Sequence, residues 1–283
     1  MNYLDPACAY CPSAVRACRA GEAEARGPGF CPGKVDPDTQ AAARALYDDP
    51  ESLKIAQVSA QVESAGYCQW TRVEEVVQFA KRMGYRKIGI ANCISFVDQA
   101  YVLSGILESH GFDVVSVACK NGSIPKEAIG IEEHEKIRPG KFEALCNPIA
   151  QAELLNAHGC EFNVVMGLCI GHDSLFFKYA HAPSTVLVAK DRVLGHNPVA
   201  QAEMLNAHGC EFNVVMGLCI GHDSLFFKYA KGLSTVLVAK DRVLGHNPVA
   251  ALHLADSYYS RLWGPDKPAK PPKLPVAGRR ASR

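Results

Sequence analysis

TRVEEVVQFAKRMGYRKIGIANC, residues 71–93, contains a helix start, a helix and a buried strand in one short stretch. Thr71 and Glu74 have the spacing of a capping box, which predicts a helix that begins here and runs to Met83. The apolar run KIGIA at 87–91 follows after a short joint and predicts a buried strand. A helix that leads directly into such a strand indicates an α/β protein.

The same alternation continues along the chain. We expect a helix over 97–110, ended by Gly111, and a strand over 112–118. Helices and strands that alternate with short joints are typical of a parallel sheet covered by helices on both faces. The sequence therefore predicts a doubly wound, Rossmann- or flavodoxin-like α/β domain over residues 70–262.

An internal repeat lies within this domain. Residues 147–196 recur as residues 197–246 with only five differences, which are Ile149/Val199, Leu154/Met204, His181/Lys231, Ala182/Gly232 and Pro183/Leu233. Each copy predicts helix, strand, helix and strand, so we expect six strands where a single copy would give four. Solenoid repeats share an apolar pattern rather than near-identity. A recent in-frame duplication and an error of sequence assembly would both leave this trace.

Composition limits the partners and the compartment. The chain has 283 residues, 48% hydrophobic residues and a net charge of +1, which does not favour nucleic acid or acidic membranes as partners. Its twelve cysteines without a secretory leader or a membrane-spanning run predict a soluble, cytoplasmic protein.

Three further regions complete the predicted organisation. We expect a cysteine-rich module at 1–36, a helical linker at 37–69 and a disordered, basic, proline-rich tail at 263–283. Within the α/β domain, the segment 120–145 is long enough to be a lid or a binding loop.

Four cysteines crowd the N-terminal module. Cys8, Cys11, Cys18 and Cys31 read C-x2-C-x6-C-x12-C, in a segment too short to form a core of its own. A metal ion would supply the missing folding energy, and four thiolates suit tetrahedral Zn²⁺. A [4Fe-4S] cluster is also held by four cysteines, and free or disulfide-forming thiols are the third alternative. The sequence predicts a zinc site here, with the cluster as its alternative.

A second set of cysteines follows the expected strands. Cys93, Cys119 and Cys169 each close an apolar run, and Cys146 lies just before the helix that Asn147 caps. The carboxyl ends of parallel strands share one edge, where ligands bind. A free cysteine is also a common small apolar core residue. We expect Cys93, Cys119 and Cys146 to contribute to a thiol, metal or cofactor site at this edge.

GLCIGHDS at 167–174 is the sharpest local motif. A strand ends at Cys169 and a helix starts near Asp173, so the positive helix end favours a thiolate or a small bound anion. The pattern G-x-C-x-G is formally the nucleophile elbow of a cysteine hydrolase, with Asp191 and His196 in triad order. Under this alternative Cys169, His172 and Asp173 are catalytic, and the second copy repeats them as Cys219, His222 and Asp223.

The chain resembles a prokaryotic family of uncharacterised metal-binding proteins, domain of unknown function 1847. The resemblance rests on the four N-terminal cysteines and on the stretches TRVEE (71–75), MGYRKIGIA (83–91), LESHGF (107–112), GSIPK (122–126), CNP (146–148) and GLCIGHDS (167–174). It implies zinc binding by Cys8, Cys11, Cys18 and Cys31. We therefore expect a metal-binding protein of unknown activity, with an iron–sulfur redox protein and a Cys169 hydrolase as alternatives. The repeat departs from the family, which has a single position for it.

Overall fold

The computed structural model describes residues 5–11, 18–22, 27–190 and 211–265, apart from 217, 219, 221, 242, 245 and 246. The expected helix at the start of the second copy, and nearly all of the expected basic tail, lie outside these residues. The described part is an α/β protein, as the sequence predicts. None of its helices is both long enough and apolar enough to cross a membrane.

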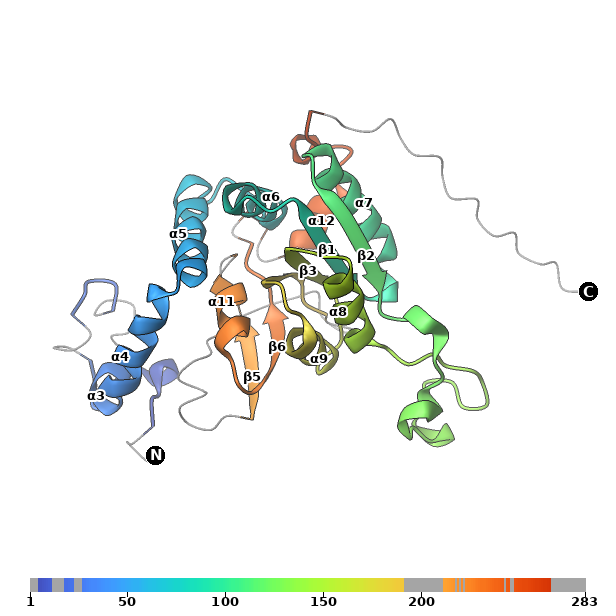
Figure 1. Ribbon diagram of the computed structural model, residues 1–283, viewed down its shortest axis with the longest axis horizontal. Coiled ribbons are helices and arrows are strands. Elements are labelled where there is room, and N and C mark those ends of the chain that lie inside the picture. Colours follow the sequence, from blue (N-terminus) through green and yellow to red (C-terminus); the bar gives the residue numbers. More distant parts are fainter. Residues whose placement is uncertain are drawn as a thin grey trace, which may run out of the picture.

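Short helices form the N-terminal part. They are η1 (Cys8–Tyr10), α3 (Pro32–Val35), α4 (Pro37–Ala45), η2 (Leu46–Asp48) and α5 (Pro50–Ala65). Asp36 and Asp49 cap α4 and α5 by accepting hydrogen bonds from Thr39 N and Ser52 N. These helices lie on one side of the molecule, away from β1 and β2 (Figure 1).

The capping box at Thr71 forms as predicted. The Thr71 N–H donates to Glu74 Oε2 at 2.7 Å and the Glu74 N–H donates to Thr71 Oγ1 at 3.3 Å, and α6 (Arg72–Met83) begins there. Gly84 ends the helix in the left-handed conformation, φ +82°. The strand β1 (Lys87–Asn92) follows at once.

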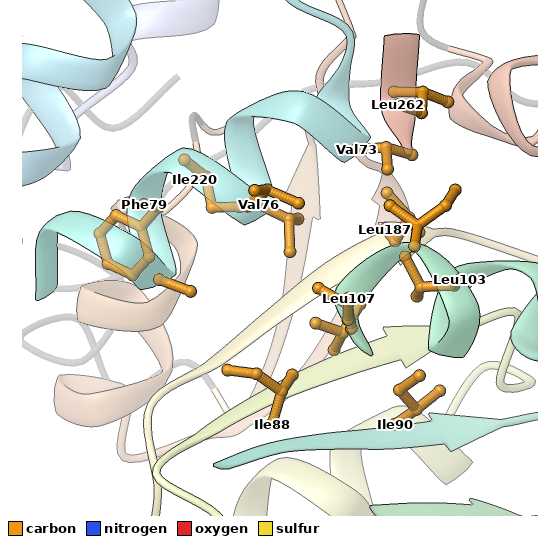
Figure 2. Close-up of a cluster of buried hydrophobic side chains, with 14 of the residues drawn as sticks. Val73, Val76, Phe79, Ile88, Ile90, Leu103, Leu107, Leu187, Ile220 and Leu262 are labelled. Atoms are coloured by element: carbon orange, nitrogen blue, oxygen red, sulfur yellow. The ribbon is translucent and has the colours of Figure 1, made fainter. Parts of the chain in front are cut away.

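Four parallel strands form the main sheet, in the order β2-β1-β3-β4. In chain order, β1 is followed by η3 (Ile94–Phe96), α7 (Val97–Ser109), β2 (Asp113–Ala118), α8 (Pro148–Ala157), β3 (Phe162–Met166), α9 (His172–Tyr179) and β4 (Ser184–Val188). Ile88 and Ile90 face α6 and α7, where Val76, Phe79, Leu103 and Leu107 complete one core (Figure 2). Ala91 and Val165 face the opposite layer, α8 and α9.

The two copies of the repeat contribute to two different sheets. We call residues 147–196 unit 1 and residues 197–246 unit 2. Unit 2 contributes β5 (Phe212–Met216), α11 (His222–Tyr229) and β6 (Leu233–Val238), and it is followed by α12 (Pro248–His253) and η7 (Ser260–Leu262). All six expected strands form, but they do not build one parallel sheet as expected, because among the described residues β5 and β6 pair only with each other.

A side chain, not a strand, covers the edge of β4. The Val186 N–H donates to Asp223 Oδ2 of α11 at 3.2 Å, so this part of the edge is occupied by a carboxylate. Unit 2 therefore docks on the main sheet through a helix and leaves its own two strands as a separate sheet.

The long segment between β2 and α8 extends away from the sheet (Figure 1). It consists of η4 (Asn121–Ser123), η5 (Lys126–Ile129), η6 (Glu133–Glu135) and turns. Lys136 is buried and pairs with Glu127 and Glu133, and Lys126 pairs with Glu143 at 2.7 Å. Ion pairs thus hold the loop together, and both of its ends return to the sheet edge described next.

Candidate thiol site at the sheet edge

The strand order creates a crevice at the carboxyl edge of the main sheet. The chain passes from β1 to β2 on one side and returns to β3 on the other side of β1, and ligands favour such a switch point. Cys93 follows β1 and donates its N–H to Met166 O at 2.9 Å, while Cys119 follows β2 and donates to Asn92 O at 2.8 Å. Backbone hydrogen bonds therefore fix both cysteines at the crevice.

Four cysteines form a continuous row here, which we call the thiol row: Cys93, Cys119, Cys146 and Cys169. Cys119 lies within hydrogen-bonding reach of Cys93 and of Cys146, and Cys146 is also reached by Cys169 and His172. The structure thus brings together five of the residues that the sequence nominates. Cys93 and Cys119 are buried, whereas Cys146 and Cys169 are partly exposed.

Cys93 is surrounded by hydrogen-bond donors. Besides the Cys119 thiol, Lys190 Nζ lies 2.8 Å and Ser95 Oγ 3.2 Å from its sulfur. These bonds, that from Cys119 first, outweigh burial and lower the pKa of Cys93 to about 4. A thiolate is therefore the stable form of Cys93 at neutral pH, and the thiolate is the nucleophile and the metal ligand.

Cys119 differs in protonation from its two neighbours, Cys93 and Cys146. The single thiol proton of Cys119 is shared between Cys146 and Cys93, and these contacts, with burial, raise the pKa of Cys119, so that it stays protonated. Hydrogen bonds from Cys119, Cys169 and His172 lower the pKa of Cys146. One thiol is thus held between two thiolates, which is chemistry suited to attack on an electrophile or to thiol exchange.

The sequence analysis does not predict Lys190 or Ser95 as site residues. Lys190 comes two residues after β4, so the rule that placed the cysteines at strand ends could also have found it. Ser95 lies two residues beyond Cys93, and its role depends on the turn of η3, which has no distinctive sequence signal.

The G-x-C-x-G turn forms around Cys169. Gly167 and Gly171 have φ of +62° and +80°, and a Cβ at Gly167 would lie 2.3 Å from the Phe96 ring. The His172 and Asp173 N–H groups both donate to the Cys169 carbonyl, and α9 begins at His172. Glycine is therefore required at Gly167 by conformation and by space.

Asp173 does not join the thiol row. Its carboxylate is buried and accepts hydrogen bonds from Thr235 Oγ1 at 2.5 Å and from Val236 N at 3.0 Å. Burial raises its pKa to about 6. Asp223 makes the equivalent contacts to Thr185 and Val186.

Most of the other residues predicted for a hydrolase lie outside the described part of the chain. Asp191, His196 and Cys219 lie outside the described residues, and the side chain of His222 is likewise not described, although α11 begins at this residue.

The four N-terminal cysteines lie near one another. Cys11 donates its N–H to Cys8 O at 3.1 Å, and Cys31 is the N-cap residue of α3. Burial raises the pKa of Cys8, and the negative charges of Cys31, Cys18 and Cys11 raise it further. Across the described parts of the chain, no three His, Cys, Asp or Glu side chains are already arranged as ligands of a metal ion.

Comparisons with known proteins identify the family. The family model "Protein of unknown function (DUF1847)" matches residues 31–187 and 191–237, well over half of the chain. The chain belongs to this family. The two DUF1847 matches end at Leu187 and Leu237, which are equivalent positions of the two units.

A curated relative agrees with this membership. The "Uncharacterized protein MJ0455" of Methanocaldococcus jannaschii is 50% identical over 150 residues, which cover 53% of this chain and 76% of that protein. No solved structure matches the chain.

Proposed function

We propose that this DUF1847 protein binds a metal ion through Cys8, Cys11, Cys18 and Cys31, with Zn²⁺ as the metal, and works in the reducing cytoplasm. One observation carries the proposal: the charges of three neighbouring cysteines act on Cys8. A divalent cation placed between neighbouring thiolates would offset their mutual repulsion. Four soft sulfur ligands fit Zn²⁺, and a [4Fe-4S] cluster is the alternative that the same ligands allow.

We further propose that the thiol row is a second, reactive site. The order of the main sheet supports a doubly wound, flavodoxin-like class, in which ligands bind at the switch point. Lys190 would bind a small anionic ligand beside Cys93, and the Cys93 thiolate would react with an electrophilic one. The hydrolase alternative receives less support, because the carboxylate of Asp173 accepts hydrogen bonds from Thr235 and Val236 and does not join the cysteines.

Metal analysis with a visible absorption spectrum tests the proposal, on full-length protein purified without oxygen. We expect about one zinc per chain and no visible band. Cys11→Ser should lose the metal, whereas Cys68→Ser, an exposed cysteine outside both sets, should retain it. A brown protein with iron and sulfide would replace zinc by the cluster, and protein without metal would overturn the proposal.

A second variant separates the two sites. Cys93→Ser should keep the zinc but lose the thiol that an alkylating reagent modifies at pH 5, where ordinary thiols are protonated. Loss of metal from Cys93→Ser but not from Cys11→Ser would move the metal to the thiol row.

A further inference from the structure

The two units exchange equivalent contacts. Asp173 on α9 of unit 1 accepts hydrogen bonds from Thr235 and Val236 on β6 of unit 2. Asp223 on α11 of unit 2 accepts the matching bonds from Thr185 at 2.5 Å and Val186 at 3.2 Å on β4 of unit 1. Each helix therefore serves the strand of the other unit.

Equivalent residues also touch each other. The rings of Phe177 and Phe227 stack with their centroids 3.7 Å apart and their planes 10° apart. Two copies whose equivalent residues touch and whose other contacts are reciprocal are related by a two-fold axis, which is the mark of an isologous interface. A cavity of about 740 Å³ lies at the same seam, lined from both units by pairs such as Ser174 and Ser224. The units are thus arranged as two molecules of a symmetric dimer would be.

The rest of the chain breaks this symmetry. Arg72 Nη2 donates to Asp223 at 2.8 Å, and Lys228 of α11 pairs with Asp49 and Glu51 at 2.8 and 2.7 Å. Within the described residues, Asp173 and Lys178 have no matching ion pairs. The reason is that the chain contains α5 and α6 once and the unit twice.

We propose that the 50-residue unit carries a self-recognition surface, formed by α9 and β4, and that unit 2 occupies here the place of a second chain. A chain with one unit would then associate with a second copy of itself. In such a dimer, Arg72 of each copy would pair with Asp173 of the other copy. Asp49 and Glu51 of each copy would pair with Lys178 of the other copy. This inference is independent of metal binding and of the thiol row.

Double-mutant cycles in the full-length protein, measured by denaturant unfolding, test the reciprocal contacts between the two units. Asp173→Asn and Thr235→Val should be non-additive by about tenfold in the unfolding equilibrium constant. The control pair within unit 1, Asp173→Asn and Thr185→Val, should be additive. Coupling within a unit instead of between units would overturn the proposal.

Deletion of residues 197–246 tests whether a chain with one unit associates with a second copy of itself. The sequence LGHNPVA at 194–200 is identical to 244–250, so the deletion leaves the same junction before α12, and the whole main sheet remains. Light scattering should give a dimer for the one-unit chain and a monomer for the full chain. Asp173→Asn with Phe177→Ala should return the one-unit chain to a monomer. A folded monomeric one-unit chain would overturn the proposal, and if it does not fold, the cycles decide.

Discussion

Units 1 and 2 have nearly the same sequence and different roles. Unit 1 completes the main sheet and places Cys169 within reach of Cys146, at the end of a row whose other cysteines have no second copy in the chain. Unit 2 forms a separate sheet and covers the edge of β4. The residue before unit 1 is Cys146, whereas His196 precedes unit 2. Nearly identical segments thus have different chemical surroundings, because different residues adjoin them.

The largest expected difference lies between the paired aspartates. At pH 7, Asp223→Asn should lower the free energy of unfolding by about 3–5 kcal/mol, because it leaves the buried Arg72 guanidinium without its carboxylate. Asp173→Asn should change it by only about 1 kcal/mol, because no guanidinium depends on that carboxylate in the described part of the chain. Urea unfolding followed by circular dichroism measures both. Equal losses would show that the two units have equivalent surroundings.

The pH dependence of stability separates the units further. The pKa of Asp173 is about 6 in the folded protein and near 3.8 when unfolded, so the folded state binds more protons between these values. Stability relative to Asp173→Asn should therefore fall by about 2.4 kcal/mol as pH rises from 4 to 7. Unfolding at several pH values gives this curve. A constant difference would contradict the burial of Asp173.

The lysines that follow β4 and β6 test which unit serves the thiol row. Lys190→Met should raise the pKa of Cys93 by about 1 unit or more, because the ammonium that stabilises the thiolate is lost. Lys240→Met, the equivalent change in unit 2, should leave that pKa unchanged. Ultraviolet absorbance of the thiolate against pH, on reduced metal-free protein, is the measurement. A shift with Lys240→Met would assign the site to both units.

The smallest expected effect concerns the exposed ion pairs of α11. The hydrogen bond from Lys228, aided by Ser52, lowers the pKa of Asp49 below its usual range. Lys228→Met should return that pKa toward its ordinary value, and Lys178→Met should not. Carbon-13 NMR of the Asp49 carboxylate measures the titration, and an effect of Lys178→Met would place unit 1 against α5.

The site illustrates how far strand-end reasoning reaches. Cys93 and Cys119 could be placed because each follows an apolar run, and the carboxyl ends of parallel strands meet. Lys190 could have been found in the same way. The contact of Asp173 with Thr235 could not, because the local motif around Cys169 is complete without unit 2.

The sequence alone determined the helices, the strands and the cysteines that end them, because caps, turns and apolar periods are written within a few residues. Only the tertiary structure decided which copy entered the main sheet and which covered its edge. Two nearly identical segments have the same local preferences, so their own residues cannot distinguish them. Their places in the chain distinguish them: unit 1 contributes β3 and β4 to the main sheet, and unit 2 gives the single Arg72 its carboxylate, Asp223.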